Sequence, residues 1–154
     1  MNRRRCSQAG FTLIEMVGVL AIIAILAAIL LPRMPHETSR PRLEAYAVET
    51  ASLLRADRNN AVRNHTEVMT QVDAPGRLIR SGSTNRVVRV PDDVVFEALL
   101  AQRCNDRRAF STINFFASGM SCGGTIVLTH AGSGFEIRVN WLTGGVELVA
   151  RAAS

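Results

Sequence analysis

The sequence contains no lysine, so all 18 of its basic residues are arginine. These arginines are scattered, and Arg107-Arg108 is the only adjacent pair after the cluster Arg3-Arg4-Arg5. That N-terminal cluster also supplies three of the five net positive charges. A nucleic-acid interface needs basic side chains gathered on one face or along one element. The charge pattern therefore does not indicate nucleic-acid binding.

The chain also lacks the short motifs of common hydrolases and nucleotide-binding enzymes. It has no His-Glu-x-x-His, no Gly-x-Ser-x-Gly and no phosphate-binding loop, and its three histidines are isolated from one another. Asp92-Asp93 and Asp106 do not have the spacing of a calcium-binding loop, which favours solvated loop charges over a cation site. We therefore predict no catalytic residue, no cofactor and no metal.

Cysteines are few, and only Cys104 and Cys122 lie beyond Cys6. Their separation excludes a Cys-x-x-Cys redox or zinc motif. In an oxidising compartment an even pair favours a disulfide, and the loop it closes would add about 3 kcal/mol of stability in the chain-entropy model. The alternative is two free thiols, either buried or partly exposed.

The most informative feature present is an apolar run over residues 11–31, in which Glu15 is the only charged residue. A helix of that length covers about 30 Å, the thickness of the hydrocarbon core of a bilayer. The arginine cluster in front of it supplies the positive charge that keeps an N-terminus in the cytoplasm. A secretory signal has a shorter apolar core followed by its cleavage site, whereas here the small residue Gly10 precedes the run. The pattern predicts a single membrane-spanning helix that cleavage at Gly10/Phe11 leaves on the protein.

The segment Gly10-Phe11-Thr12-Leu13-Ile14-Glu15-Met16 resembles the processing site of type IV prepilins and of the pseudopilins of type II secretion. In that family a membrane aspartyl peptidase, the prepilin peptidase, cuts after the glycine. The same enzyme methylates the new N-terminal amine, which is that of Phe11 here. The resemblance covers about the first 35 residues, including Pro32 just after the apolar run. It implies a cleaved leader of residues 1–10 and an N-methylated Phe11.

Glu15 needs a physical explanation, because an ionised carboxylate within a bilayer costs at least about 2.5–3.5 kcal/mol. After cleavage the nearest candidate partner is the α-amine of Phe11, one helical turn away. The family's assembly scheme instead pairs this glutamate with the N-terminus of a neighbouring subunit. The resemblance therefore implies that Glu15 sets the register between assembling subunits.

Periodicity predicts the elements beyond the apolar run. Two prolines in residues 32–35 interrupt the helix, and a helical spacing of apolar residues resumes from Glu37 and ends at or shortly after Asn59-Asn60. After His65 the pattern changes to short strands separated by turn signals. Strands are predicted at 66–72, 77–80, 86–90, 113–116, 125–130, 135–140 and 146–150. Residues 92–100 are predicted as a short helix, with an irregular crossover as the alternative.

These elements predict an α+β chain with a long N-terminal helix followed by two small antiparallel sheets, which resembles the type IV pilin-like fold. The predicted domains are a leader (1–10), a transmembrane helix (11–31), the periplasmic half of the long helix (32–65) and a periplasmic antiparallel β domain (66–154). The predicted location is the bacterial inner membrane, with a single pass, a cytoplasmic N-terminus and a periplasmic C-terminal domain.

The C-terminal third carries a second resemblance, to the domain shared by H-type minor pseudopilins of type II secretion and FimT-type minor pilins (the GspH/FimT family). It rests on the runs 115–119, 123–128 and 139–144, in which we interpret Trp141 as a core or sheet-edge aromatic. FimT-type proteins implicated in DNA uptake carry Gly-Arg-x-Arg near this end, whereas this chain has Gly144-Gly145-Val146-Glu147. Because phosphate contacts dominate non-specific DNA affinity, this difference argues against nucleic-acid binding.

The resemblance implies a minor pseudopilin of the type II secretion system, a non-enzymatic structural subunit involved in exporting folded proteins across the outer membrane. Its implied partners are other minor and major pseudopilins, the prepilin peptidase and the inner-membrane secretion platform. The alternative is a FimT-like minor pilin of a type IV pilus, acting in assembly, motility or DNA uptake. A membrane-anchored periplasmic hydrolase ranks third.

Overall fold

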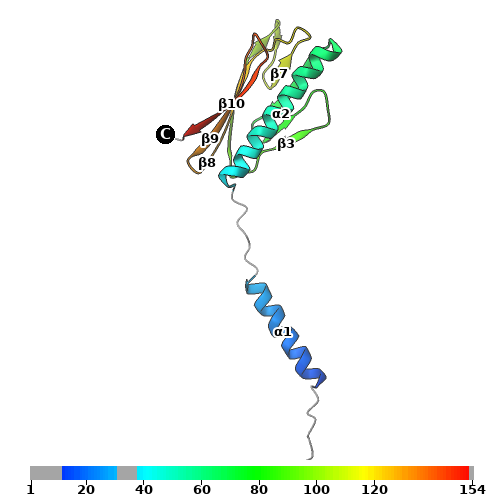
Figure 1. Cartoon of the computed structure of the whole chain (residues 1–154), viewed down its shortest axis with the longest axis vertical. Helices are drawn as coiled ribbons and strands as arrows, with labels where there is room; N and C mark the ends of the chain where they lie inside the picture. Colours follow the sequence, from blue (N-terminus) through cyan, green and yellow to red (C-terminus); the bar gives the residue numbers. More distant parts are fainter. Residues whose placement is uncertain (1–11, 31–37, 153–154) are drawn as a thin grey trace, which may run out of the picture. The chain divides into compact units, whose positions relative to one another are not determined.

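A computed structural model of the 154-residue chain describes residues 12–30 and 38–152. The chain divides into an N-terminal unit, residues 1–36, and a globular unit, residues 37–154 (Figure 1). The cleavage site Gly10/Phe11, the leader and the proline segment 32–35 lie outside the described residues.

In its described residues, 12–30, the N-terminal unit forms the helix α1 (Leu13–Leu30), with Glu15 in its first turn. Its apolar side chains are exposed on every face of the helix over residues 13–27. The predicted membrane-spanning segment, 11–31, extends beyond α1 at both ends into residues outside the described ranges. Within the described residues, no helix combines the length and the hydropathy needed to cross a membrane.

The globular unit is organised around a second helix, α2 (Arg40–Asn64). Pro41 is tolerated in its first turn, where a backbone N–H has no helical partner to lose. The helix ends at His65, which adopts the left-handed conformation (φ 52°) and donates its N–H to the carbonyl of Ala61. The predicted helical periodicity is confirmed. The buried residues of α2 are Leu43, Ala47, Thr50, Ala51, Leu53, Leu54, Asp57 and Ala61.

The first sheet has the strand order β3-β2-β1-β7, and all its pairings are antiparallel. The strands predicted at 66–72, 77–80 and 86–90 correspond to β1, β2 and β3, which pair in chain order as an antiparallel meander, and β7 joins the free side of β1. The turn between β1 and β2 is closed by the N–H of Gly76, which donates to Asp73 Oδ1 at 2.8 Å. The strands are β1 (Val68–Asp73), β2 (Leu78–Arg80), β3 (Val87–Arg89) and β7 (Thr112–Phe115).

The second sheet has the order β10-β9-β8-β4 and is also antiparallel throughout. Its strands are β4 (Val95–Leu100), β8 (Gly124–His130), β9 (Ser133–Val139) and β10 (Val146–Ala152). The helix predicted over 92–100 is wrong, because β4 pairs along its whole length with β8 and places Phe96 opposite Leu128. Val95 and Leu99 are exposed apolar residues at two of the three solvent-facing positions of β4, which weakens the two-residue alternation of polar and apolar residues expected of a strand.

Two further strands, β5 (Arg103–Cys104) and β6 (Arg107–Arg108), form a separate hairpin that the sequence did not predict. Its two central residues, Asn105 and Asp106, have φ values of 49° and 60°. Positive φ at both central positions is typical of the tight turns that match the twist of paired strands. Asn and Asp tolerate that conformation better than most residues.

Helix α2 packs against both sheets and provides the common wall of a single core (Figure 1). It contacts β1, β3 and β7 of the first sheet and β8, β9 and β10 of the second. Each fully buried large side chain contributes about 1.5–3 kcal/mol of transfer free energy. The largest of them are Phe115, Leu43, Leu53, Leu54, Ile79, Ile113, Ile126, Leu128 and Ile137.

Candidate functional site

The sequence placed its assembly site at the start of α1, and Glu15 is the member of that site that the structure describes. The N–H of Glu15 donates to the carbonyl of Thr12 at 3.0 Å, which starts the helix. The Glu15 side chain is exposed, and so are its apolar neighbours Leu13 and Ile14. Because Gly10 and Phe11 lie outside the described residues, cleavage, methylation and the pairing of Glu15 all remain predictions.

In the globular unit, a buried carboxylate lies where α2 meets the first sheet. Asp57 is fully buried, on the side of α2 that faces the core. Its two oxygens accept hydrogen bonds from the hydroxyls of Thr70, Ser81 and Ser83, each at 2.6 Å. The backbone N–H groups of Gly82 and Ser83 add bonds at 3.0 and 3.3 Å. Five donors thus replace the water that the carboxylate loses on burial.

This network attaches the loop between β2 and β3 to the helix. The hydroxyl of Ser81 also accepts from the N–H of Thr84 at 3.0 Å, so the loop is bonded internally as well. Gly82 is required here because a Cβ at this position would collide with the backbone carbonyl of Met69 on β1. No sequence motif indicates the role of Asp57. The one available signal is its position among the apolar residues of the predicted helix, because a buried carboxylate is normally hydrogen-bonded.

Two arginines of α2 donate hydrogen bonds to backbone carbonyls in or next to the second sheet. Arg58 donates from Nε and Nη2 to the carbonyl of Thr143 at 3.1 and 2.9 Å, and from Nε to the carbonyl of Gly119 at 3.3 Å. Arg55 donates to the carbonyl of Val146, at the start of β10, at 2.9 Å. Gly144 has φ 60°, and a Cβ there would collide with the carbonyl of Gly119. The glycines of the C-terminal motif are therefore structural.

A third polar contact joins the start of α2 to the loop before β4. Asp93 accepts from the N–H of Thr38 at 2.5 Å and from its hydroxyl at 3.0 Å. His130, at the end of β8, donates from Nδ1 to the carbonyl of Asp93 at 2.7 Å. The hydrogen bond from the Thr38 N–H is the main reason that the pKa of Asp93 is lowered from its ordinary value of 3.8.

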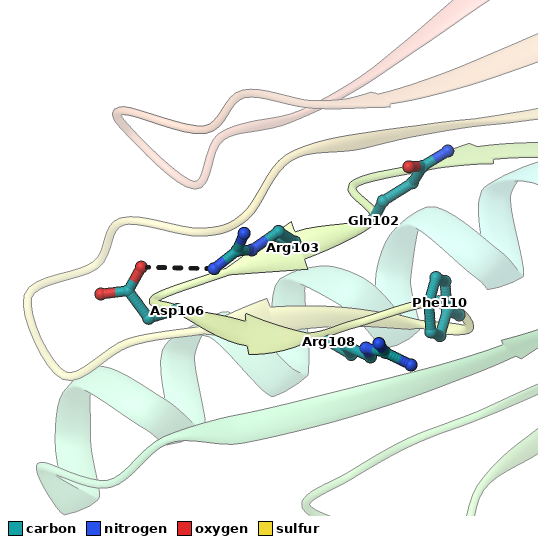
Figure 2. A pocket seen from close by; sticks show the side chains of 5 residues that line it. All are labelled: Gln102, Arg103, Asp106, Arg108 and Phe110. Atoms are coloured by element: carbon teal, nitrogen blue, oxygen red, sulfur yellow. Dashed lines mark ion pairs between the residues drawn. The ribbon is translucent and has the colours of Figure 1, made fainter.

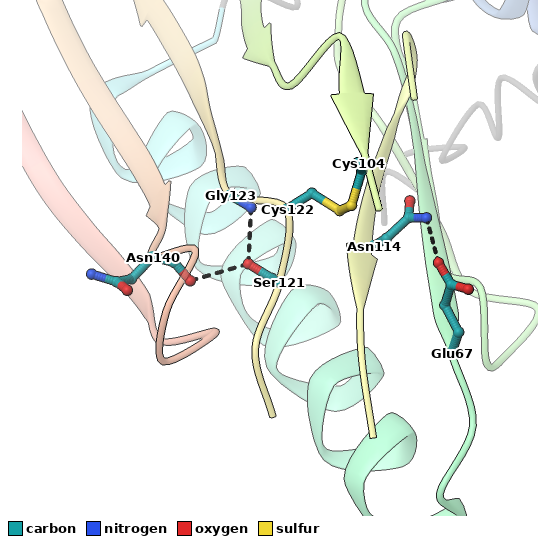
Figure 3. Close-up of a disulfide and its surroundings, with 7 residues drawn as sticks. All are labelled: Glu67, Cys104, Asn114, Ser121, Cys122, Gly123 and Asn140. Carbon is teal, nitrogen blue, oxygen red and sulfur yellow. Dashed lines mark hydrogen bonds between the residues drawn. A yellow bond between two sulfur atoms is a disulfide. The ribbon is translucent and has the colours of Figure 1, made fainter. Parts of the chain in front are cut away.

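A disulfide between Cys104 and Cys122 joins the β5–β6 hairpin to the rest of the globular unit (Figure 3). The two Cα atoms are 5.6 Å apart, within the usual range for this bond. The N–H of Cys122 donates to the carbonyl of Asn114 on β7 at 3.0 Å. Next to it, the hydroxyl of Ser121 donates to the carbonyl of Asn140 at 3.0 Å (Figure 3). Cys122 is thus held between the two sheets, and the disulfide fixes the hairpin to that position.

Two hollows lie on either side of Arg103. The first, of about 490 Å³, is lined by Gln102, Arg103, Asp106, Arg108 and Phe110 (Figure 2). The second, of about 530 Å³, is lined by Arg103, Cys104, Asn105, Phe116, Met120, Ser121, Cys122 and Trp141. Both are open to solvent, and both are built from the hairpin or the residues that the disulfide connects to it.

The core position offered for Trp141 is wrong, because the residue is 62% exposed, and its interpretation as a sheet-edge aromatic stays a prediction. Trp141 follows the end of β9, in a turn where Asn140 Oδ1 accepts from the N–H groups of Leu142 and Thr143 at 2.9 and 3.0 Å. The chain reverses here between β9 and β10, with the N–H of Asn140 donating to the carbonyl of Gly145 at 2.9 Å, so the alternation of the strand no longer decides which side chain is buried. Sequence periodicity could not detect the change.

Comparisons with known proteins agree with this architecture. Residues 5–31 match the family described as the prokaryotic N-terminal methylation motif. The chain is 28% identical over 138 residues to the type II secretion system protein H of Xanthomonas campestris pv. campestris, a match that covers 89% of this chain and 80% of that protein.

Two solved structures share the fold. The minor pseudopilin EpsH from the type 2 secretion system of Vibrio cholerae has a TM-score of 0.55 at 11% identity, covering 70% of this chain and 95% of that one. The type IV minor pilin FimU of Pseudomonas aeruginosa has a TM-score of 0.55 at 18% identity, covering 76% and 98%. The chain therefore carries the N-terminal methylation motif and has a type IV pilin-like fold, which confirms the predicted fold class.

The Asp57 network generates a test of stability. We expect Asp57→Ala to lower the free energy of unfolding by about 3 kcal/mol or more, because it leaves several buried donors without an acceptor. The measurement is urea unfolding of the full chain in detergent, followed by far-UV circular dichroism. Glu44→Ala, on the exposed side of α2, is the control and should change stability by less than about 0.5 kcal/mol. Equal effects of the two variants would contradict the assigned role of Asp57.

The contact between Asp93 and Thr38 generates a test in acid. Since the pKa of Asp93 is lower in the folded state, its stabilising effect is complete above the unfolded-state pKa and is lost as the pH falls through the folded-state pKa. We expect Asp93→Asn to be less stable than wild type at neutral pH. The gap should begin to shrink as the pH falls below the unfolded-state pKa of about 3.9, and it should close below the folded-state pKa. Urea unfolding at a series of pH values measures this gap. A difference in stability that is independent of pH would rule out the carboxylate as its source. Thr38→Val removes the hydroxyl but keeps the N–H donor, so it should cause only part of the stability loss seen in Asp93→Asn.

Proposed function

We propose that this chain is an H-type minor pseudopilin of the type II secretion system, a structural subunit of a pseudopilus that helps export folded proteins across the outer membrane. The observation that carries the proposal is the combination of the methylation motif over residues 5–31 with similarity to a type II secretion protein H along 89% of the chain. That combination spans both the N-terminal segment and the globular unit.

The proposed location is the bacterial inner membrane, with residues 11–31 as a single membrane-spanning helix and the globular unit in the periplasm. A helix that is apolar on all sides is typical of a segment buried in a membrane or a protein core, and α1 is apolar on all sides over residues 13–27. The disulfide between Cys104 and Cys122 is consistent with an oxidising compartment such as the periplasm. The three leading arginines favour a cytoplasmic N-terminus.

In this proposal the prepilin peptidase cuts the bond between Gly10 and Phe11 and methylates the Phe11 amine. The new N-terminus carries a positive charge close to the membrane. Glu15 of a neighbouring subunit then forms an ion pair with that N-terminus, which removes the cost of about 2.5–3.5 kcal/mol of leaving a carboxylate unpaired in the bilayer. The charge pair fixes the axial position of one helix against the next, so a single residue couples insertion to assembly.

The globular unit has a mechanical and non-enzymatic role in this proposal. It packs against other minor and major pseudopilins while the inner-membrane secretion platform extends the pseudopilus. Force applied to such a subunit acts on its loops as well as on its core. The bonds from Arg58 to Thr143 and from Ser81 to Asp57 connect the loops of both sheets to one helix, which supports a unit that moves as one body.

The second candidate is a minor pilin of a type IV pilus, acting in assembly, motility or DNA uptake. Its support is the similarity to FimU, which equals the similarity to EpsH in TM-score. Both structures are below 25% identity and support the fold alone. Gly145 and Glu147 stand where the Gly-Arg-x-Arg pattern has its two arginines, and this difference, together with the similarity to protein H along most of the chain, favours the secretion role.

A clean deletion separates the two candidates. We expect the deletion strain to lose extracellular activity of exported enzymes while surface pili and DNA uptake stay at wild-type levels. Enzyme assays of culture supernatant and periplasm, with pilus counts and a transformation assay in parallel, measure this. Reintroduction of the wild-type chain should restore secretion. Loss of pili or of DNA uptake with secretion intact would move the protein to the pilus role.

Glu15 provides a test of the assembly step. We expect Glu15→Ala to insert in the membrane and be cleaved, but to fail to assemble, because the N-terminus of the neighbouring subunit loses its counter-charge. Cross-linking of pseudopilin helices in membranes and restoration of secretion in the deletion strain are the two readouts. Glu44→Ala is the matched control on the exposed side of α2. Assembly of Glu15→Ala at the wild-type level would refute the pairing.

A further inference from the structure

The β5–β6 hairpin is peripheral to the core, yet it is covalently fixed. It forms a two-stranded sheet of its own and belongs to neither of the four-stranded sheets. An isolated two-stranded hairpin is marginally stable in water, so strands of two residues each would fray without further support. The disulfide to Cys122 and the bond from the N–H of Ala109 to the carbonyl of Gln102, at 3.0 Å, supply that support. The fold thus maintains a defined position for a segment that the core does not need.

A continuous series of bonds connects the hairpin to the exposed tryptophan. Arg103 precedes Cys104, which the disulfide joins to Cys122. Ser121, the residue before Cys122, donates its N–H to the carbonyl of Trp141 at 2.9 Å. Arg103 and Trp141 therefore line the same hollow at positions fixed by covalent and hydrogen bonds. Such preorganisation reduces the entropy lost when a partner binds.

The side chains on this surface are of the types that dominate protein interfaces. Trp141 is 62% exposed and Phe110 is 65% exposed, and Met120 lies in the same hollow as Trp141. Arg108 lies over the Phe110 ring, with its guanidinium carbon 5.9 Å from the ring centroid. Aromatic residues, Met and Arg are enriched at the centres of interfaces, where Trp and Arg often contribute most of the binding energy. We call Arg103, Arg108, Phe110, Met120 and Trp141 the hairpin surface.

Several arginines of the globular unit have local partners for their side chains. Arg138 and Arg151 lie beside the carboxylate of Glu136, and Arg58 is bonded to backbone carbonyls. On the hairpin, three arginines are accompanied by one carboxylate, Asp106, which lies 3.9 Å from Arg103 and is fully exposed. Among the described residues, Arg108 has no ion pair. The hairpin surface therefore has positive charge available for an outside partner.

We propose that the hairpin surface binds an acidic segment of another protein, with carboxylates at Arg103 and Arg108 and an apolar or aromatic side chain against Trp141. This deepens the proposed function, because it assigns the docking surface and the chemistry of its partner. A nucleic acid fits less well, because two arginines on this surface provide few phosphate contacts. The apolar Met120 beside Trp141 also suits a peptide side chain better than a phosphodiester backbone.

The antiparallel hairpin supplies a matched control. Arg103 and Arg108 are directly opposite one another, so they share one side of the hairpin. Arg107 is opposite Cys104 and lies on the other side, and it lines neither hollow. Arg107→Glu therefore changes the net charge of the hairpin as much as Arg108→Glu does, without altering the hairpin surface.

The experiment titrates the full chain in detergent with a synthetic peptide of alternating Glu and Leu residues containing one Phe. Trp141 is the only tryptophan, so its fluorescence reports binding at the surface directly. We expect a saturable change in emission that weakens with salt, and an affinity about tenfold lower for Arg108→Glu and for Arg103→Glu. Arg107→Glu should keep the wild-type affinity within about twofold. Circular dichroism checks that each variant is folded.

Each of three results with peptides would overturn the proposal: no saturable change with the acidic peptide, equal losses in Arg107→Glu and Arg108→Glu, or equal binding of a matched peptide with Lys in place of Glu. Tighter binding of an oligo-dT strand than of the acidic peptide would assign the surface to nucleic acid instead and would also overturn it. The Cys104→Ser/Cys122→Ser variant should lose affinity while its helix content is unchanged, and unchanged affinity would contradict the role of the disulfide. These titrations do not depend on secretion. A deletion strain that secretes normally would therefore refute the proposed function, but it would not decide whether the hairpin surface binds an acidic segment.

Discussion

The carboxylate of Asp57 is the polar interaction on which the arrangement of the globular unit depends most. A buried charge without a cation is stable only if enough donors surround it, and those donors come from β1 and from the loop that follows β2. The helix and the first sheet must therefore dock in one register for the carboxylate to be satisfied. Apolar packing alone would tolerate small shifts between α2 and the sheet, whereas a five-donor network does not.

The arginines of α2 extend the same principle to the second sheet. Arg55 and Arg58 reach the carbonyls of Val146 and Thr143, so a single helix bonds to loops or strands of both sheets. These contacts are made to backbone atoms, so they depend on the path of the chain more than on its side chains. A subunit that has to transmit force gains from this arrangement, because its loops cannot move independently of its core.

The hairpin follows a different principle. Its position depends on the disulfide and on one short series of backbone bonds, and it adds little to the core. A fold that only had to be stable would not need an exposed tryptophan beside Arg103, whose charge is met by one exposed carboxylate at 3.9 Å. Exposing Trp141 to water is unfavourable, yet a disulfide holds the residues around it in place. Such a local cost in stability is typical of a binding surface.

The sequence by itself determined the N-terminal processing motif, the apolar helix, the position of α2 and most strands of both sheets, because these follow from local patterns of charge and from periods of 3.6 and 2 residues. Glu15 could be singled out for the same reason, since one charge in an apolar run is visible without a structure. The strand β4, the burial of Asp57, the β5–β6 hairpin and the exposure of Trp141 were decided only by the tertiary structure. Each of them depends on a partner distant in the chain: β8 for β4, the loop after β2 for Asp57, Cys122 for the hairpin and Ser121 for Trp141.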